Sequence, residues 1–334
     1  MITIARFFKV FVMEIHKLTL TVCKDAAKSA RSVSPVTGKS RLYHFIDAIN
    51  AYVFHGCSTR QYSIGGFYKY RSFDRKNIYT GGRCYMVKGL FNKDSDLHLL
   101  DDKVDFNTLF ADEVKREWIS CRTASMADIE AFAATHDTLV VKPADGMKGG
   151  GVHLLDKSEL PELVGKNVLL EECIVRHPDL IFNNKSVNTI RMVTVRDREG
   201  VVHFLKAGLR CGVGESFVDN LNAGGIAYPL NVKYGFIEEP GVSGSYSIDK
   251  DENVCIHPGT DTFMVGYRIP FWKETLEMVE SAARKLENIR FVGWDIAITP
   301  TGPSLVEGNS RPGTSIIEEM GLERGFYRKI MSCK

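Results

Sequence analysis

At 334 residues, the chain is long enough to bury a substantial core divided among two or three subdomains. Its hydrophobic content of 44% and charged content of 25% are ordinary for a globular protein in water, and its net charge of +2 gives no case for nucleic acid as the main partner. The eight cysteines are scattered, with no C-x-x-C pair and no histidine cluster at zinc spacing, which argues against a zinc site and favours a reduced, cytoplasmic compartment.

The first residues are apolar but are interrupted by Arg6, Lys9 and Glu14, too often for the core of a signal peptide. No apolar run approaches the roughly 18 residues of a membrane span. Six apolar residues recur instead at helical spacing, namely Ile4, Phe7, Phe8, Phe11, Ile15 and Leu18. Such a stripe more often packs on its own domain than on a bilayer. We therefore expect a cytoplasmic protein with at most peripheral contact, through this helix, with the inner face of the membrane.

Residues 1–95 are expected to be mainly helical with loops, including an amphipathic helix over residues 45–54. Gly65-Gly66 and Gly81-Gly82 mark breaks. A basic and aromatic segment lies between them, comprising Tyr68, Lys69, Tyr70, Arg71, Arg75 and Lys76. We interpret this segment as a solvated surface anchored by its tyrosines, the alternative being contact with an anionic substrate.

A glycine-rich loop is the clearest signal in the middle of the chain. Acids at 101–105 begin a helix, and Ser125 is expected to cap a second helix over residues 127–134. Residues 138–143 form a buried strand that carries Lys142 near its end, and residues 145–151 follow as the loop before another strand. Glycines let backbone N–H groups approach phosphate oxygens, and Lys142 supplies charge. The loop is not a P-loop, because G-x-x-x-x-G-K-[ST] followed by a helix is absent.

Two strands carry charges that need partners. Residues 167–172 form a strand ending in Glu171-Glu172, which suits the hydroxyl groups of a ribose or is simply surface charge. Residues 186–195 alternate as a strand, and Arg191 interrupts its apolar face. A phosphate or a carboxylate would satisfy Arg191, and Arg210 on the neighbouring strand is a second candidate anion ligand.

The hairpin over residues 290–309 suggests a metal site. Gly302 suits a three-residue loop in which Thr299 pairs with Pro303, and this register places Asp295 opposite Glu307. Asn309 lies two residues further on and shares their face. Two carboxylates and a carboxamide that converge in this way suit Mg²⁺. The alternative is that Asp295 is an acid at the edge of the sheet and Glu307 a solvated one.

The ordered set of motifs resembles the ATP-grasp superfamily, and more narrowly the sugar-transfer-associated ATP-grasp proteins of bacterial polysaccharide gene clusters. The resemblance covers roughly residues 68–325. The motifs that carry it are Asp102-Lys103, Val-Val-Lys142-Pro, the glycine-rich loop, Leu-Glu171-Glu172, Asn188-Thr-Ile-Arg191, Arg210, Asn222-Ala-Gly-Gly225, Gly293-Trp-Asp295 and Val-Glu307-Gly-Asn309. It implies an α+β class with the ATP-grasp fold, in which two α+β subdomains grip ATP. We expect a helical N-terminal region over 1–95, a small subdomain with the glycine-rich lid over 96–174, and a large subdomain with the metal site over 175–334.

The same resemblance implies roles for individual residues. The cofactor-binding set is Lys103, Lys142, Asp145, Lys148, Gly149, Gly150, Gly151, Glu171, Glu172 and Asn188. Lys103 and Lys142 would contact the phosphates of ATP, and Glu171 or Glu172 the adenosine. The metal ligands would be Asp295, Glu307 and Asn309, holding Mg²⁺ or Mn²⁺. Lys142, Arg191 and Arg210 would be catalytic, the two arginines at the γ-phosphate or the acceptor carboxylate.

The implied chemistry is amide ligation through an acyl phosphate. ATP would activate a small-molecule carboxylate, such as one on a sugar or glycan precursor, and an amine would then displace phosphate. Two alternatives stay open. One is a kinase of the same fold that phosphorylates its acceptor, and the other is a non-catalytic nucleotide-binding scaffold in glycan assembly.

Overall fold

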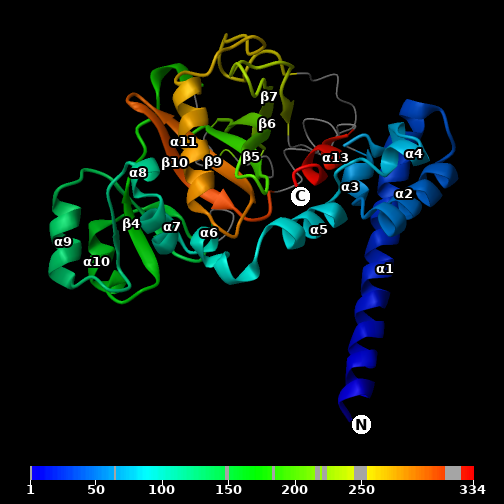
Figure 1. The fold of residues 1–334 in the computed structure, drawn as a ribbon, viewed down its shortest axis with the longest axis horizontal. Helices are drawn as coiled ribbons and strands as arrows, with labels where there is room; N and C mark the ends of the chain where they lie inside the picture. The colour runs from blue at the N-terminus through cyan, green and yellow to red at the C-terminus, as the bar shows by residue number, and fades with distance from the viewer. Residues whose placement is uncertain are drawn as a thin grey trace.

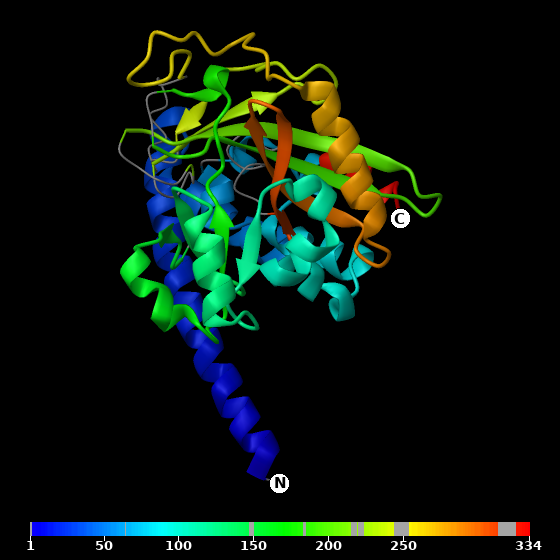
Figure 2. The same cartoon turned by 90° about the vertical axis from the view of Figure 1, so that its left-hand side faces the viewer.

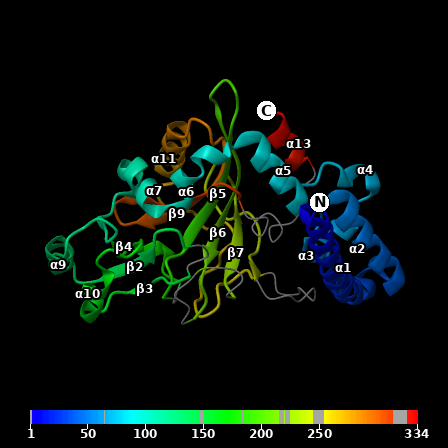
Figure 3. The same ribbon diagram turned by 90° about the horizontal axis from the view of Figure 1, so that it is seen from below.

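The computed structural model describes residues 2–63, 65–146, 150–182, 185–214, 219, 224–243, 254–312 and 325–334, with side chains from residue 20 onwards except Ser72. Figure 1 shows a large central sheet with a small sheet at one end and a group of N-terminal helices at the other, and Figure 3 shows the same order from below. The mixture of helices with two antiparallel sheets confirms the predicted α+β class.

The N-terminal region is helical, as predicted. It comprises α1 (Ile2–Thr37), α2 (Arg41–His55), α3 (Thr59–Ser63), the 3₁₀ turn η1 (Phe67–Lys69), α4 (Ser72–Arg75) and α5 (Gly81–Phe91). Ser40 caps α2 by accepting from the Tyr43 N–H, and Gly56 ends it in the left-handed conformation. The first half of α1 projects away from the rest of the molecule (Figures 1 and 2). Among the described residues, no helix is long and apolar enough to cross a membrane.

The small sheet has the strand order β1-β4-β2-β3, and all its pairs are antiparallel. Its strands are β1 (Trp118–Ser120), β2 (Leu139–Pro143), β3 (His153–Leu154) and β4 (Val168–Glu172). Two helices pack against this sheet, namely α9 (Met126–Ala134) and α10 (Leu160–Leu163). The turn η3 (Lys157–Glu159) leads into α10. Ser125 and Asp128 form a capping box at the start of α9, which confirms the predicted cap.

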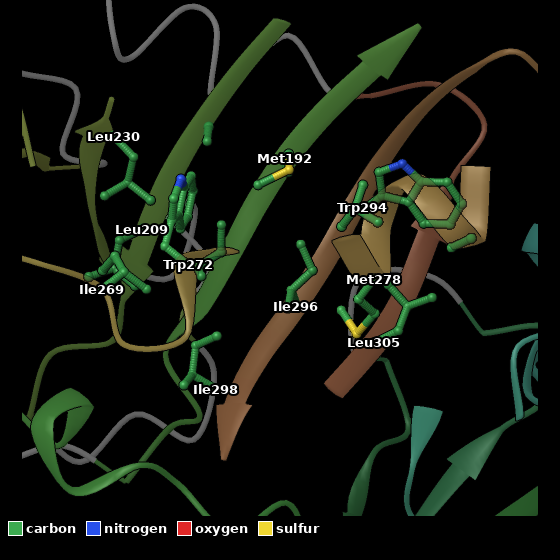
Figure 4. Close-up of a cluster of buried hydrophobic side chains, with 14 of the residues drawn as sticks. Met192, Leu209, Leu230, Ile269, Trp272, Met278, Trp294, Ile296, Ile298 and Leu305 are labelled. Carbon is green, nitrogen blue, oxygen red and sulfur yellow. The ribbon is translucent and has the colours of Figure 1, made fainter. Parts of the chain in front are cut away.

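The large sheet has the order β10-β9-β5-β6-β7-β8. Its strands are β5 (Thr189–Arg196), β6 (Val202–Cys211), β7 (Ile226–Leu230), β8 (Val242–Ser243), β9 (Phe291–Thr299) and β10 (Gly302–Asn309). The helix α11 (Trp272–Lys285) packs over one face, where Met278 joins Met192, Trp294 and Leu305 in the main core (Figure 4). The other face packs against α5 and α13 (Phe326–Met331) through residues such as Phe291 and Phe326.

A run of short elements connects the N-terminal helices with the small sheet: η2 (Asp94–Asp96), α6 (His98–Asp101), α7 (Lys103–Leu109) and α8 (Ala111–Val114). The turn η4 (Pro178–Leu180) later connects the small sheet with the large one. Leu100, Phe106 and Phe110 of the first run are buried in the main core, and the Phe110 and Trp294 rings meet edge to face at 5.7 Å. These helices therefore pack with the large sheet.

Candidate active site

The β9–β10 hairpin turns one residue earlier than the sequence predicted. Thr299 pairs with Gly302 across a two-residue loop, so the expected pairing of Thr299 with Pro303 is wrong. Gly302 has a φ of 128°, a conformation that favours glycine. If the pairing continued without interruption, Glu307 would be displaced from its position opposite Asp295 and would point to the other face of the sheet.

A β-bulge restores the predicted arrangement. The register shifts between Leu305 and Glu307, so the extra residue Val306 is accommodated and Glu307 pairs directly with Asp295. Asn309 lies two residues further along, and its Nδ2 donates to the Glu307 Oε1 at 3.2 Å. The three side chains predicted to form a metal site therefore gather on one face of the hairpin, although the register that brings them there differs from the one expected.

Two buried arginines neutralise Asp295. Arg191 lies opposite Asp295 on β5 and donates to both carboxylate oxygens, with 2.8 Å between Nη2 and Oδ2. Arg210 Nη2 lies 3.0 Å from the same Oδ2, and it also donates to Thr189 Oγ1 at 2.6 Å. Burial alone would raise the pKa of Asp295, but the charges of Arg191 and Arg210 outweigh burial and hold that pKa well below its usual range. The anion that satisfies Arg191 in this structure is thus a protein carboxylate.

Glu307 has the opposite electrostatic environment. Burial, followed by the negative charge of the adjacent Asp295, raises the pKa of Glu307 to about 7, although Arg191 and Asn309 partly oppose the shift. A carboxylate that is held close to a second carboxylate in this way is more stable when a cation lies beside it.

The donor set fits a hard divalent cation. A carboxylate has about four acceptor positions, and the arginines occupy three of those on Asp295. Glu307 accepts from Asn309 and also shares a hydrogen bond with Asp295. A bound cation would take the place of the proton in that carboxyl–carboxylate contact. No cluster of three or more His, Cys, Asp or Glu side chains able to hold a metal occurs within the described ranges, so this candidate consists of two carboxylates completed by a carboxamide.

A pocket of about 150 Å³ lies between the small sheet and β10. It brings together five of the residues predicted to bind cofactor or metal, which are Lys103, Lys142, Gly150, Glu171 and Glu307. The other lining residues are Asn107, Pro143, Gly146, Val152 and Val306. Lys142 of the small sheet and Lys103 of α7 therefore line the same space as Glu307 of the large sheet.

Lys103 begins α7 and is positioned by the start of the glycine-rich loop. Its N–H donates to the Ala144 carbonyl at 2.8 Å, and its Nζ donates to the Gly146 carbonyl at 2.7 Å. Burial lowers the pKa of Lys103, and the positive charge of Lys142 acts in the same direction. Both lysines would gain from a polyanion in the pocket.

Glu171 is already fully engaged by protein donors. Its carboxylate is ion-paired with Lys142 and with Arg116 at 2.9 Å, and it accepts from Asn107 at 3.1 Å. Burial would raise the pKa of Glu171, but these two cations lower it to about 2. Glu172 is less buried and lines a second pocket of about 270 Å³ beside Cys173 and the hairpin loop. Of the two residues predicted to contact the adenosine, Glu172 is therefore the one that a ligand can reach.

The side chain of Asn188 is hydrogen-bonded to backbone groups and lines neither of the two pockets. Its Nδ2 donates to the Leu180 carbonyl at 2.7 Å, and its Oδ1 accepts from the Gly212 N–H at 3.1 Å. These bonds join the segment before β5 to the end of β6, which favours a structural role over the predicted contact with a cofactor.

The glycine-rich loop is described only at its ends. Lys148 and Gly149 lie outside the described residues, whereas Asp145 and Gly150 are exposed. Gly151 has a φ of 76°, and a Cβ there would lie 2.8 Å from the Pro143 ring, so both its conformation and its surroundings require glycine.

Two residues that form ion pairs with the site residues were not predicted from the sequence. Arg116 is buried between the sheets and donates to the Leu305 carbonyl at 2.6 Å while pairing with Glu171. Asp219 lies 3.5 Å from Arg210. Neither residue belongs to a local motif, and each becomes recognisable only when its partner from a distant strand is known.

Comparison with known proteins gives one family and several distant structural likenesses. The sequence matches the family described as sugar-transfer associated ATP-grasp over residues 157–330, more than half of the chain. A comparison with curated proteins finds no significant match. The structure of the ATP-grasp ligase PsnB, complexed with a phosphomimetic variant of minimal precursor, Mg and ADP, is 12% identical, with 72% of this chain and 61% of PsnB covered and a TM-score of 0.45.

Two synthetases show similar values. N5-carboxyaminoimidazole ribonucleotide synthetase from Thermotoga maritima is 14% identical, with 75% of this chain and 56% of that chain covered and a TM-score of 0.42. N5-carboxyaminoimidazole synthetase from Staphylococcus aureus, complexed with ADP, is 15% identical, with coverages of 70% and 52% and a TM-score of 0.43. The chain spans about three fifths of the length of PsnB and a smaller share of the two synthetases.

Proposed function

Because the chain belongs to the sugar-transfer associated ATP-grasp family, as its motifs predicted, we propose that it is an ATP-dependent carboxylate–amine ligase. Its substrates would be ATP, a carboxylate on a sugar or polysaccharide precursor, and an amino acid or another amine. The observation that carries the proposal is the pocket in which Lys103 and Lys142 face Glu307, next to the buried pair formed by Asp295 and Arg191. The small subdomain (96–174) and the large subdomain (175–334) would grip ATP between them.

Each group has a role that follows from its charge and position. Lys103 and Lys142 would neutralise the phosphates of ATP, with the glycine-rich loop closing over them. Glu172, at the second pocket, would contact the adenosine. Arg191 and Arg210 would offset the repulsion between the γ-phosphate and the acceptor carboxylate.

Asp295, Glu307 and Asn309 would hold Mg²⁺, or Mn²⁺ in its place. When bound, the ion would supply positive charge to the phosphate oxygens. The raised pKa of Glu307 fits this role, because a carboxylate held beside Asp295 needs a nearby cation in order to be stable in its ionised form.

The reaction would proceed in two displacements. A carboxylate oxygen attacks the γ-phosphorus of ATP, the bond to the bridging oxygen breaks, and ADP leaves with that bonding pair. An amine then attacks the acyl carbon of the acyl phosphate, inorganic phosphate departs, and the amine loses a proton to give the amide. The protein positions two anions and stabilises their charge, and no covalent bond to a side chain is needed.

Hydroxylamine trapping tests the proposal. Incubation with ATP, Mg²⁺, candidate carboxylates and hydroxylamine should yield a hydroxamate together with ADP, because hydroxylamine intercepts an acyl phosphate. Glu307→Gln should abolish the hydroxamate, whereas the matched control Glu130→Gln, on the exposed face of α9, should leave it unchanged. ADP with a phosphorylated acceptor and no hydroxamate would establish the kinase alternative. Nucleotide binding without turnover on any acceptor would support the scaffold.

A further inference from the structure

The two ends of the chain carry opposite charge. Residues 1–93 contain sixteen lysines and arginines and four acids, whereas residues 94–334 contain twenty-seven and thirty-seven. The N-terminal helices therefore have a net charge of +12, and the remainder of the chain, which holds the proposed active site, has a net charge of −10. Such an asymmetry is typical of a segment that binds an anionic partner.

The exposed side of α2 is apolar. Leu42, Tyr43, Ile46, Val53 and Phe54 are all exposed, with values of 68% for Leu42 and 73% for Phe54. At 100° per residue these five side chains fall within an arc of about 120°, which they share only with Asn50. The opposite side of α2 packs on α1 and α3 through Ala48 and Ala51. We call the five exposed residues the apolar arc.

Basic side chains flank the apolar arc. Lys39 lies at its beginning, with its Nζ 4.3 Å from the centre of the Tyr43 ring. At its other edge, Arg75 of α4 is held to Asp47 of α2 by two hydrogen bonds of 2.6 and 2.7 Å, which fixes α4 beside the arc. The neighbours of Arg75, namely Arg71, Phe73 and Lys76, are exposed, and Phe73 is 76% exposed.

An apolar arc with basic residues at its edges suits some kinds of partner better than others. Aliphatic side chains such as Leu42, Ile46 and Val53 gain free energy in an apolar medium and gain little from a nucleic acid, which stacks on aromatic rings. A second copy of the chain docked through the same surface would place two basic surfaces face to face. The interface of an anionic bilayer offers both an apolar medium and negative charge.

We propose that the apolar arc and its flanking basic residues dock on an anionic phospholipid membrane, with α2 lying in the interfacial plane. Figures 1 and 3 show these helices at the end of the molecule opposite the small sheet, so docking leaves the pocket between the sheets accessible. The inference does not depend on the proposed ligase activity, because it uses none of the residues of that site.

Vesicle flotation of the full chain tests the docking. The protein should float with vesicles that contain phosphatidylglycerol and remain behind with phosphatidylcholine alone, and the fraction bound should fall as salt is added. The double variant Ile46→Glu with Val53→Glu should lower partitioning at least about tenfold. The double variant Arg71→Gln with Lys76→Gln should lower it roughly fivefold per charge. The control Val201→Glu, at an aliphatic residue between β5 and β6 that is 49% exposed, should have no effect.

Folding and competing partners are measured on the same samples. All these positions are exposed, so thermal midpoints and binding of an ATP analogue should match those of the wild type. Equal flotation of the Ile46→Glu, Val53→Glu variant and the wild type would overturn the proposal. The proposal would also be overturned if the wild type bound no vesicles but sedimented as a dimer, and the double variant sedimented as a monomer. Binding of a labelled single-stranded oligonucleotide without vesicle binding would assign the surface to nucleic acid instead.

Discussion

At pH 8, replacing Asp295 by Asn and Glu307 by Gln should change stability in opposite directions, although both substitutions remove one carboxylate from the same cluster. Asp295 is 2% exposed and is paired with Arg191 and Arg210. Asn at this position would leave the buried Arg191 without its carboxylate partner and Arg210 with Asp219, 3.5 Å away, which costs about 3–5 kcal/mol. That loss is a large fraction of the roughly 5–15 kcal/mol that stabilises a typical domain.

Glu307 should behave differently because its ionised form is unfavourable in the metal-free protein. Its pKa is about 7 in the folded chain against 4.5 when exposed. The folded state therefore binds this proton more tightly than the unfolded state, so the contribution is fully present below pH 4.5 and is lost as the pH rises through 7. At about 1.4 kcal/mol per pKa unit, ionisation of Glu307 costs up to about 3 kcal/mol, and less to the extent that solvent screens this partly exposed group. Glu307→Gln removes that cost.

Urea denaturation in EDTA at pH 5 and pH 8 measures both effects. Asp295→Asn should have a lower free energy of unfolding than the wild type at both pH values. Glu307→Gln should equal the wild type near pH 5 and exceed it at pH 8, and Glu130→Gln should match the wild type throughout. If Glu307→Gln loses stability at pH 8 as Asp295→Asn does, Glu307 is stabilised by partners that the structure does not assign to it, and the electrostatic reasoning is refuted.

Three further substitutions test individual contacts. Arg116→Met should lower the free energy of unfolding by about 3 kcal/mol in urea denaturation, since a buried ion pair loses one partner. Lys142→Met should weaken binding of a non-hydrolysable ATP analogue at least about tenfold by calorimetry, because it removes a cation from the pocket. Gly151→Ala should weaken the same binding severalfold, because the added methyl group meets the ring of Pro143. Gly165→Ala has a similar φ of 73° but open space around it, so it should lower stability alone.

Local signals in the sequence were reliable where a local interaction determines the structure. The helix capped by Ser125 was predictable because the cap and its partner Asp128 are three residues apart. The same holds for the helix in the segment 45–54, whose apolar periodicity appears as α2. The family was recognisable because many short motifs occur in a fixed order, although each is weak alone.

Contacts between distant strands could not be predicted in the same way. The sequence indicated a phosphate or a carboxylate as the partner of Arg191 without identifying it. In the structure the partner is Asp295, which lies more than a hundred residues later in the sequence. The pairing of Glu171 with Arg116 had no sequence signal either. The hairpin shows how two local errors can cancel, because the shorter loop and the bulge at Val306 together return Glu307 to Asp295. A sequence pattern with period two contains no sign of a bulge.

The pairing of Asp295 with two arginines also changes how the cluster should respond to an anion. In the structure, Arg191 and Arg210 satisfy Asp295, and burial together with the charge of Asp295 raises the pKa of Glu307. A polyanion near Arg191 would compete with Asp295 for the guanidinium group, and any arginine drawn towards it would uncover oxygens of Asp295. The cluster would then have a larger negative potential at Asp295 and Glu307, so its affinity for a cation would rise. By linkage, a cation held there would strengthen the binding of the anion by the same factor. Asp295 is thus better described as a group shared between the arginines and the candidate cation site than as a metal ligand alone.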